Sequence, residues 1–114
     1  MEVKGEDYRV WYEQSESTIY CQGSLRLAGT DQYAPIVRIL EHTIEQVPKV
    51  IILNLCQLEF LNSSGINVLS KFVIKVRQKE NIGITVKGGE DIPWQGKSLK
   101  NLQRLMPSLK LEWQ

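Results

Sequence analysis

Residues 50–65 read VIILNLCQLEFLNSSG, a run of apolar residues that ends in asparagine, two serines and glycine. Its first part, Val50 to Leu55, is almost continuously apolar, which is typical of a central strand covered on both faces. Cys56 to Asn62 is predicted to be a connection. From Ser63 to Lys79, apolar residues recur every three or four positions, which predicts a helix.

The same alternation of strand and helix extends to both sides of this stretch. Residues that favour strands come first, in two runs separated by a polar break, and this indicates an opening hairpin. Gly23 to Thr30 fits either a short strand extension or a loop. The other predicted elements are strands over Tyr8 to Glu13, Thr18 to Gln22, Ile82 to Lys87 and Leu109 to Trp113, with helices over Asp31 to Val47 and Gln95 to Met106.

Strands that alternate with helices imply crossover connections and a largely parallel sheet, which the opening hairpin makes mixed. The predicted fold class is therefore α/β: a mixed sheet of about five strands with about three main helices packed largely on one face. The chain has 114 residues and contains no repeat or linker, so a single domain over residues 1–114 is predicted.

The helix predicted over Asp31 to Val47 has one apolar stripe. Thr30 or Asp31 can cap its start, and Pro48 ends it. The only histidine, His42, lies off the stripe and is predicted to be solvated. The stripe consists of Tyr33, Ile36, Val37, Leu40, Ile44 and Val47.

Composition excludes several classes of function. The formal net charge is +1 and the basic residues are scattered, which argues against a nucleic-acid-binding protein. No apolar stretch approaches the roughly 20 residues of a membrane span, and the polar start shows no signal peptide. Two cysteines and one histidine make no zinc motif, so neither a metal nor another cofactor is predicted. We expect a cytoplasmic protein that is a monomer or a weak dimer.

Ser63 and Ser64 stand where the second helix is predicted to start. Serine is favoured there because its oxygen can accept a hydrogen bond from a free backbone N–H group. A phosphate on either serine would meet such N–H groups and the positive end of the helix dipole. It would also add nearly two negative charges to a polar, neutral surface. The pattern fits a plain helix cap and also a phosphorylation switch.

The segment Leu61-Asn62-Ser63-Ser64-Gly65-Ile66-Asn67-Val68-Leu69 resembles the signature of STAS domains of the bacterial anti-sigma factor antagonist type. Their pattern is a hydrophobic strand, a short loop that ends in Asp-Ser-Ser-Gly or Asp-Ser-Thr-Gly, and an aliphatic helix. The resemblance covers the whole order of elements. The phrase from Ile92 to Leu99 also resembles a branch of uncharacterised STAS proteins, many of them from cyanobacteria.

This resemblance implies a function in signal transduction and transcription regulation by partner switching. The serine after the family's aspartate, here Ser63, would be phosphorylated by a serine kinase that is also the anti-sigma factor, with Ser64 as the second acceptor. The unmodified protein would bind this partner, and a serine phosphatase would reset the switch. The expected partner-binding residues are Asn62, Ser63, Ser64, Gly65 and Asn67, with Ser24 and Arg26 of the neighbouring segment beside them.

Two departures from the family pattern bear on this function. Asn62 replaces the aspartate. Asparagine keeps a similar shape and can still cap the helix or form hydrogen bonds, but it lacks the charge. Gly23-Ser24-Leu25-Arg26 stands where many members have Gly-Glu-Leu-Asp. A STAS scaffold without phosphorylation, or a ligand-sensing module, is therefore the alternative function.

Enzymatic activity is not predicted. A nucleophile elbow needs Gly-x-Ser-x-Gly, and Leu61 stands in place of the first glycine. A serine–histidine pair could use only His42, which belongs to another helix. Gly96-Lys97-Ser98 echoes the end of a phosphate-binding loop but lacks the earlier glycine of that motif.

Cys21 and Cys56 each lie in an apolar run and are predicted to be reduced. Titration of the denatured protein with a thiol reagent, in the absence of reductant, should report two thiols for each chain. A value near zero would mean a disulfide and an oxidising compartment.

Overall fold

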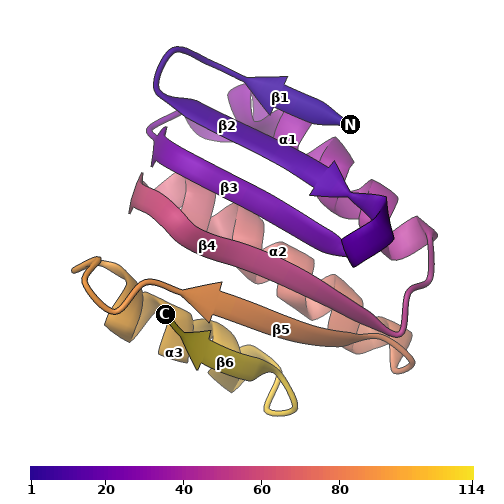
Figure 1. Ribbon diagram of the computed structural model, residues 1–114. Helices are drawn as coiled ribbons and strands as arrows, with labels where there is room; N and C mark the ends of the chain where they lie inside the picture. Colours follow the sequence, from indigo (N-terminus) through magenta and orange to yellow (C-terminus); the bar gives the residue numbers. More distant parts are fainter.

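The computed structural model describes all residues, 1–114. Its six strands form one sheet in which spatial order follows chain order (Figure 1). The first three strands pair antiparallel, and the third to sixth pair parallel. The predicted mixed sheet is confirmed, with six strands: β1 (Glu2–Lys4), β2 (Tyr8–Glu13), β3 (Thr18–Leu25), β4 (Val50–Leu61), β5 (Gly83–Gly88) and β6 (Lys110–Trp113).

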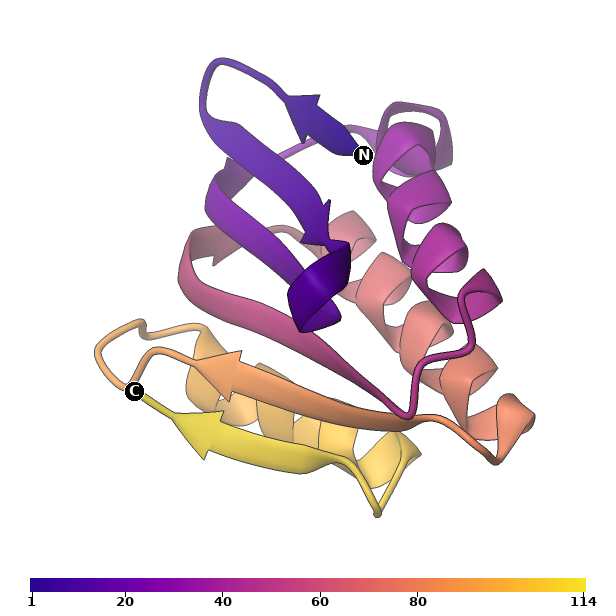
Figure 2. The same cartoon turned by 45° about the vertical axis from the view of Figure 1, so that its right-hand side comes forward.

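Three helices cover one face of this sheet: α1 (Gly29–Glu45), α2 (Ser63–Lys79) and α3 (Gln95–Leu105). Figure 1 shows all three behind the strands, and the turned view in Figure 2 separates this helical layer from the sheet. A short 3-10 turn, Gln14–Glu16, joins β2 to β3. The prediction of helices on one face is therefore confirmed.

The one-sided helical layer corrects the expectation that β4 is covered on both faces. Residues that point toward the helices are buried, as Ile51 and Leu53 are, whereas Ile52 and Asn54 on the other face are only partly covered. The register places Ile52 between Thr18 of β3 and Thr85 of β5. Strand neighbours, rather than a second layer of helices, shield this apolar side chain.

The helix-free face carries an aromatic cluster over β2 and β3. The rings of Trp11 and Tyr20 are stacked with their centroids 4.8 Å apart. The guanidinium of Arg9 lies 4.0 Å from the centre of the Trp11 ring and pairs with Glu2 of β1. Stacking and cation–π contact partly shield the rings from water without a covering element.

Two strands differ from the sequence prediction. Cys56 to Leu61 continues β4 and is not a connection, because β3 pairs with it as far as Leu25 and Leu61. The register shifts along this part, where the side-chain oxygen of Asn54 accepts a hydrogen bond from the Cys56 N–H group at 3.0 Å. The edge strand β1 was not predicted, since a three-residue strand with two exposed charged residues gives almost no pattern.

Helix α1 also differs from the prediction at both ends. Its N-cap is Ala28, so neither Thr30 nor Asp31 caps it, and Gln32 instead accepts from the Ala28 N–H group at 2.9 Å. It ends at Glu45, and Val47 is 59% exposed in a left-handed conformation with φ 47°. Val47 therefore does not belong to the apolar stripe. Only Gln46 and Val47 separate the helix from Pro48, where the chain turns toward β4.

The buried side chain of Gln95 connects α3 to the sheet. Pairing between β4 and β5 stops at Asn54 and Lys87, so beyond this point the carbonyl groups of β4 that face away from β3 have no partner in β5. The Gln95 amide donates to the carbonyl oxygens of Leu55 at 2.8 Å and Leu58 at 3.1 Å, and it accepts from the Gly89 N–H group at 2.7 Å. Trp94 also donates to the Leu58 carbonyl at 3.0 Å, so its main contacts lie within the fold.

Replacing Gln95 with leucine should destabilise the protein by at least about 2 kcal/mol, because buried backbone groups lose their partners while the side chain keeps its size. Urea denaturation measures this free energy of unfolding. The matched control is Gln78→Leu, which makes the same change at an exposed position of α2. Equal stability of the two variants would contradict this role of Gln95.

Candidate functional site

The candidate site lies at the end of the sheet where β3 and β4 finish. These strands are parallel neighbours, and their last residues, Leu25 and Leu61, are paired. The segments that follow them therefore start side by side. The Asn62 N–H group donates to the Leu25 carbonyl oxygen at 3.1 Å, which fixes the start of α2 beside the loop that leads to α1.

Asn62, and neither serine, caps α2. Its side-chain oxygen accepts from the Gly65 N–H group at 2.9 Å and from the Tyr33 hydroxyl at 2.6 Å. Its side-chain nitrogen donates to the Leu27 carbonyl oxygen at 2.8 Å. The expectation that a serine makes the cap is therefore wrong. Asn62 is half-buried with both side-chain groups bonded inside the chain, so it positions its neighbours more than it offers polar groups to a partner.

Tyr33 and Gly65 complete the support beneath the helix start. Burial raises the pKa of the Tyr33 hydroxyl, which therefore keeps its proton and donates to Asn62. Gly65 is buried, and a Cβ atom there would lie 2.2 Å from a methyl carbon of Leu61 and 2.7 Å from the Tyr33 oxygen. Gly65 thus serves close packing and leaves little surface for a partner to touch.

The serines and Asn67 have the exposure that a recognition surface requires. Ser63 and Asn67 are exposed, and Ser64 is half-exposed. Ser63 is the first residue of α2, at the positive end of the helix dipole. Because Asn62 takes the Gly65 N–H group, those of Ser63 and Ser64 remain as free donors of the first turn.

Ser24 of β3, Phe60 of β4 and Arg26, which follows β3, lie at the same end of the sheet, with Ser24 and Phe60 on the face opposite the buried Leu25 and Leu61. Ser24 pairs with Phe60 across the sheet, and both are at least partly exposed. The guanidinium of Arg26 lies 4.6 Å from the centre of the Phe60 ring, which is 37% exposed. Sequence reasoning missed Phe60 because it took residues 56–62 for a connection. An aromatic residue three positions before Ser63 was the available signal.

The other chemically notable side chains lie apart from this surface. His42 is in the last turn of α1, roughly 20 Å along the helix from its start beside Asn62. It is half-buried and meets Tyr12 edge to face at 6.0 Å, so the expectation of a solvated histidine is wrong. The geometry therefore provides no serine–histidine pair.

Both cysteines are free thiols in the structure. Burial raises the pKa of Cys21 to about 12, and burial also raises the pKa of Cys56. Both side chains are therefore protonated near neutral pH, where a thiol is a poor nucleophile and a poor metal ligand. No group of three histidine, cysteine or acidic residues is placed to hold a metal ion. None of the helices is long and apolar enough to cross a membrane.

Asn62→Asp should lower stability by about 1–2 kcal/mol, as measured by urea denaturation at pH 7. A carboxylate can still accept from Tyr33 and Gly65, but it cannot donate to Leu27 and would face that carbonyl oxygen directly. Asn67→Asp is the matched control, since it adds the same charge to an exposed site of α2. A gain in stability at position 62 would show that the Leu27 contact is dispensable.

Comparison with protein-family profiles and with curated protein sequences finds no match. Solved structures do share the fold. A chain in the complex of diguanylate cyclase SiaD with its activator SiaC from Pseudomonas aeruginosa is 9% identical, with a TM-score of 0.75 over 100% of this chain and 99% of that one. SiaC of the same organism is 11% identical, with a TM-score of 0.73 over 100% of this chain and 96% of that one.

An anti-sigma factor antagonist from Mycobacterium paratuberculosis is 16% identical, with a TM-score of 0.57 over 96% of this chain and 82% of that one. At these identities the likeness concerns the fold. The fold implied by the Asn-Ser-Ser-Gly segment and the order of elements is thereby confirmed: the chain has the STAS fold seen in an anti-sigma factor antagonist and in SiaC.

Proposed function

We propose that this chain is a phosphorylation-switched partner-binding protein whose phosphate acceptor is Ser63. The observation that carries this proposal is the division of roles at the start of α2. Asn62 caps the helix from inside, and Ser63 stands exposed one residue later. The hydroxyl that a kinase must reach is therefore not needed to hold the helix.

The surface around Ser63 has features that protein partners use. Phe60 offers an exposed aromatic ring beside Arg26, and aromatic and arginine side chains are enriched at protein interfaces. Asn67 adds a polar group one turn along the helix from Ser63. In this proposal the unmodified surface binds the partner, with Ser24 and Ser64 at its margin.

Phosphorylation would act at the interface and leave the fold intact. Phosphate at the first residue of α2 meets free N–H groups and the helix dipole, which stabilises the helix by about 0.3–1 kcal/mol. The same group brings nearly two negative charges into a contact surface, where it repels acidic groups and must be desolvated. The modified protein therefore stays folded and releases its partner.

The partner proposed from the family resemblance is a serine kinase of the anti-sigma factor type, opposed by a serine phosphatase. The likeness to SiaC favours a second candidate, because SiaC is described as the activator of a diguanylate cyclase. In that case the bound partner is an enzyme that this chain activates, and no sigma factor is involved. Both candidates use the same surface and the same serine.

Incubation with ATP and the partner serine kinase should place phosphate on Ser63, as read by phosphopeptide mapping. Ser63→Asp should weaken binding of this partner by about tenfold or more, and Ser63→Ala should keep binding but resist release by ATP. Ser108→Asp, at an exposed serine outside the site, is the matched control. Phosphate on neither Ser63 nor Ser64, with binding unchanged in Ser63→Asp, would leave a STAS scaffold.

A further inference from the structure

A groove of about 370 Å³ runs between α1 and α2 on the outer side of the helical layer. Leu40 of α1 and Phe72 of α2 form its floor and are also part of the core. Ala34, Val37 and Val68 form its walls and are only half-buried. The two helices thus leave an apolar channel that no part of this chain covers.

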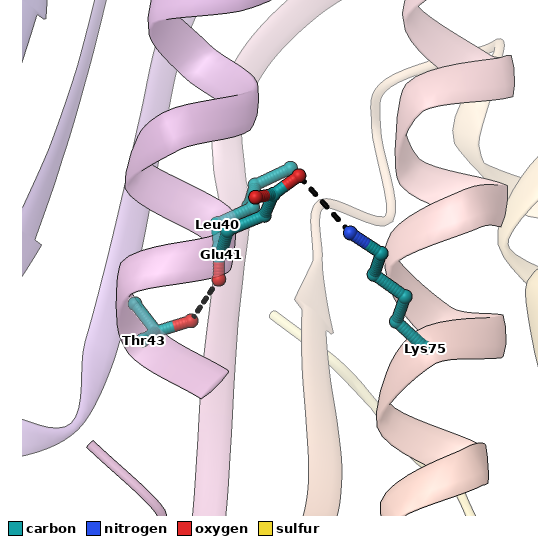
Figure 3. Close-up of polar contacts among 4 residues, drawn as sticks. All are labelled: Leu40, Glu41, Thr43 and Lys75. Carbon is teal, nitrogen blue, oxygen red and sulfur yellow. Dashed lines mark hydrogen bonds and ion pairs between the residues drawn. The ribbon is translucent and has the colours of Figure 1, made fainter. Parts of the chain in front are cut away.

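Basic residues dominate the rim of the groove. Arg38 stands on α1, and Lys71 and Lys75 stand on α2, whereas Glu41 is the only acidic residue that lines it. Figure 3 shows Lys75 reaching across to α1, with its Nζ 3.0 Å from a carboxylate oxygen of Glu41. Both partners are about half-exposed, so this ion pair is weak and Lys75 can exchange to another carboxylate.

One end of the groove lies beside the first turns of α1 and α2. Thr30 and Val68 line the end that lies nearest to the start of α2. Thr30 follows the loop that Asn62 binds, and Val68 comes directly after exposed Asn67. From Thr30 to Glu41 the groove follows α1 for on the order of 16 Å, about three helical turns.

We propose that this groove receives an acidic amphipathic helix of the partner, an inference that rests on the proposed function. The apolar stripe of such a helix fits the channel, in the way that helix-in-groove recognition works. Its flanking carboxylates meet Arg38, Lys71 and Lys75. Phosphate on Ser63, five residues before Val68 on the same helix, then repels the acidic segment through its charge, which gives the switch an electrostatic cause.

The test uses a synthetic peptide of about 18 residues, long enough to form a helix, with one leucine stripe flanked by glutamates. A second peptide has the same composition in scrambled order, and a third has lysine in place of every glutamate. Each is titrated into the isotopically labelled full chain and followed by NMR. The striped acidic peptide should shift the amide signals of Ala34, Val37, Val68 and Lys71, and the other two should not.

A double variant, Arg38→Glu and Lys71→Glu, should bind the acidic peptide about tenfold or more weakly. Lys97→Glu with Lys100→Glu, two exposed positions of α3, is the matched control and should leave the affinity unchanged. Equal binding of the scrambled peptide, or shifts confined to another face, would overturn the inference. The inference would also be overturned if monomeric decanoate shifted the amide signals of the groove residues and the peptide did not. The groove would then be a site for small carboxylates.

The groove and the phosphorylation switch can be overturned separately. Phosphopeptide mapping reads Ser63 whatever occupies the groove, so failure of the unmodified chain to bind the peptide, while the kinase still phosphorylates Ser63, overturns only the groove. Peptide binding that persists while neither serine is phosphorylated overturns the switch and supports the groove.

Discussion

The side-chain amide of Asn62 joins the three segments that meet at the end of the sheet. It accepts from Tyr33 of α1 and from Gly65 of α2, and it donates to the carbonyl oxygen of Leu27 in the loop between β3 and α1. Only an amide both donates and accepts in this geometry, since a carboxylate has no proton to donate at neutral pH. These bonds fix the first turn of α2 and with it the placement of Ser63, while the apolar stripe of the helix packs in the core.

Sequence patterns predicted the helices better than the strands, and the reason is physical. Both predicted bounds of α2 agree with the structure, because a capping residue precedes it and its apolar stripe is regular. The last part of β4 was missed because Gln57 and Glu59 face solvent where β5 no longer pairs with the strand. Its carbonyl groups are satisfied by Gln95, forty residues beyond Leu55, and no local pattern reports such a contact.

The same distinction holds at the candidate site. The exposure of Ser63 and Asn67, which were expected among the partner-binding residues, follows from their place on the helix. The inward role of Asn62 depends on Tyr33, 29 residues earlier in the chain, and was not predictable from neighbouring residues. Phe60 became recognisable only when the register placed it opposite Ser24 and beside Arg26. Local periodicity therefore predicts which residues are exposed, whereas long-range pairing determines which exposed residues form one surface.

The separation between capping and exposure explains how a modification could act without damaging the fold. If Ser63 itself capped α2, its hydroxyl would hold a backbone N–H group, and any chemistry on it would loosen the first turn. Here Asn62 holds the Gly65 N–H group, so the bonds that fix the helix do not involve the serine. A charge added at Ser63 therefore changes the potential along α2 and leaves its position unchanged. Because α2 also forms one wall of the groove, that change in potential falls on whatever the groove binds.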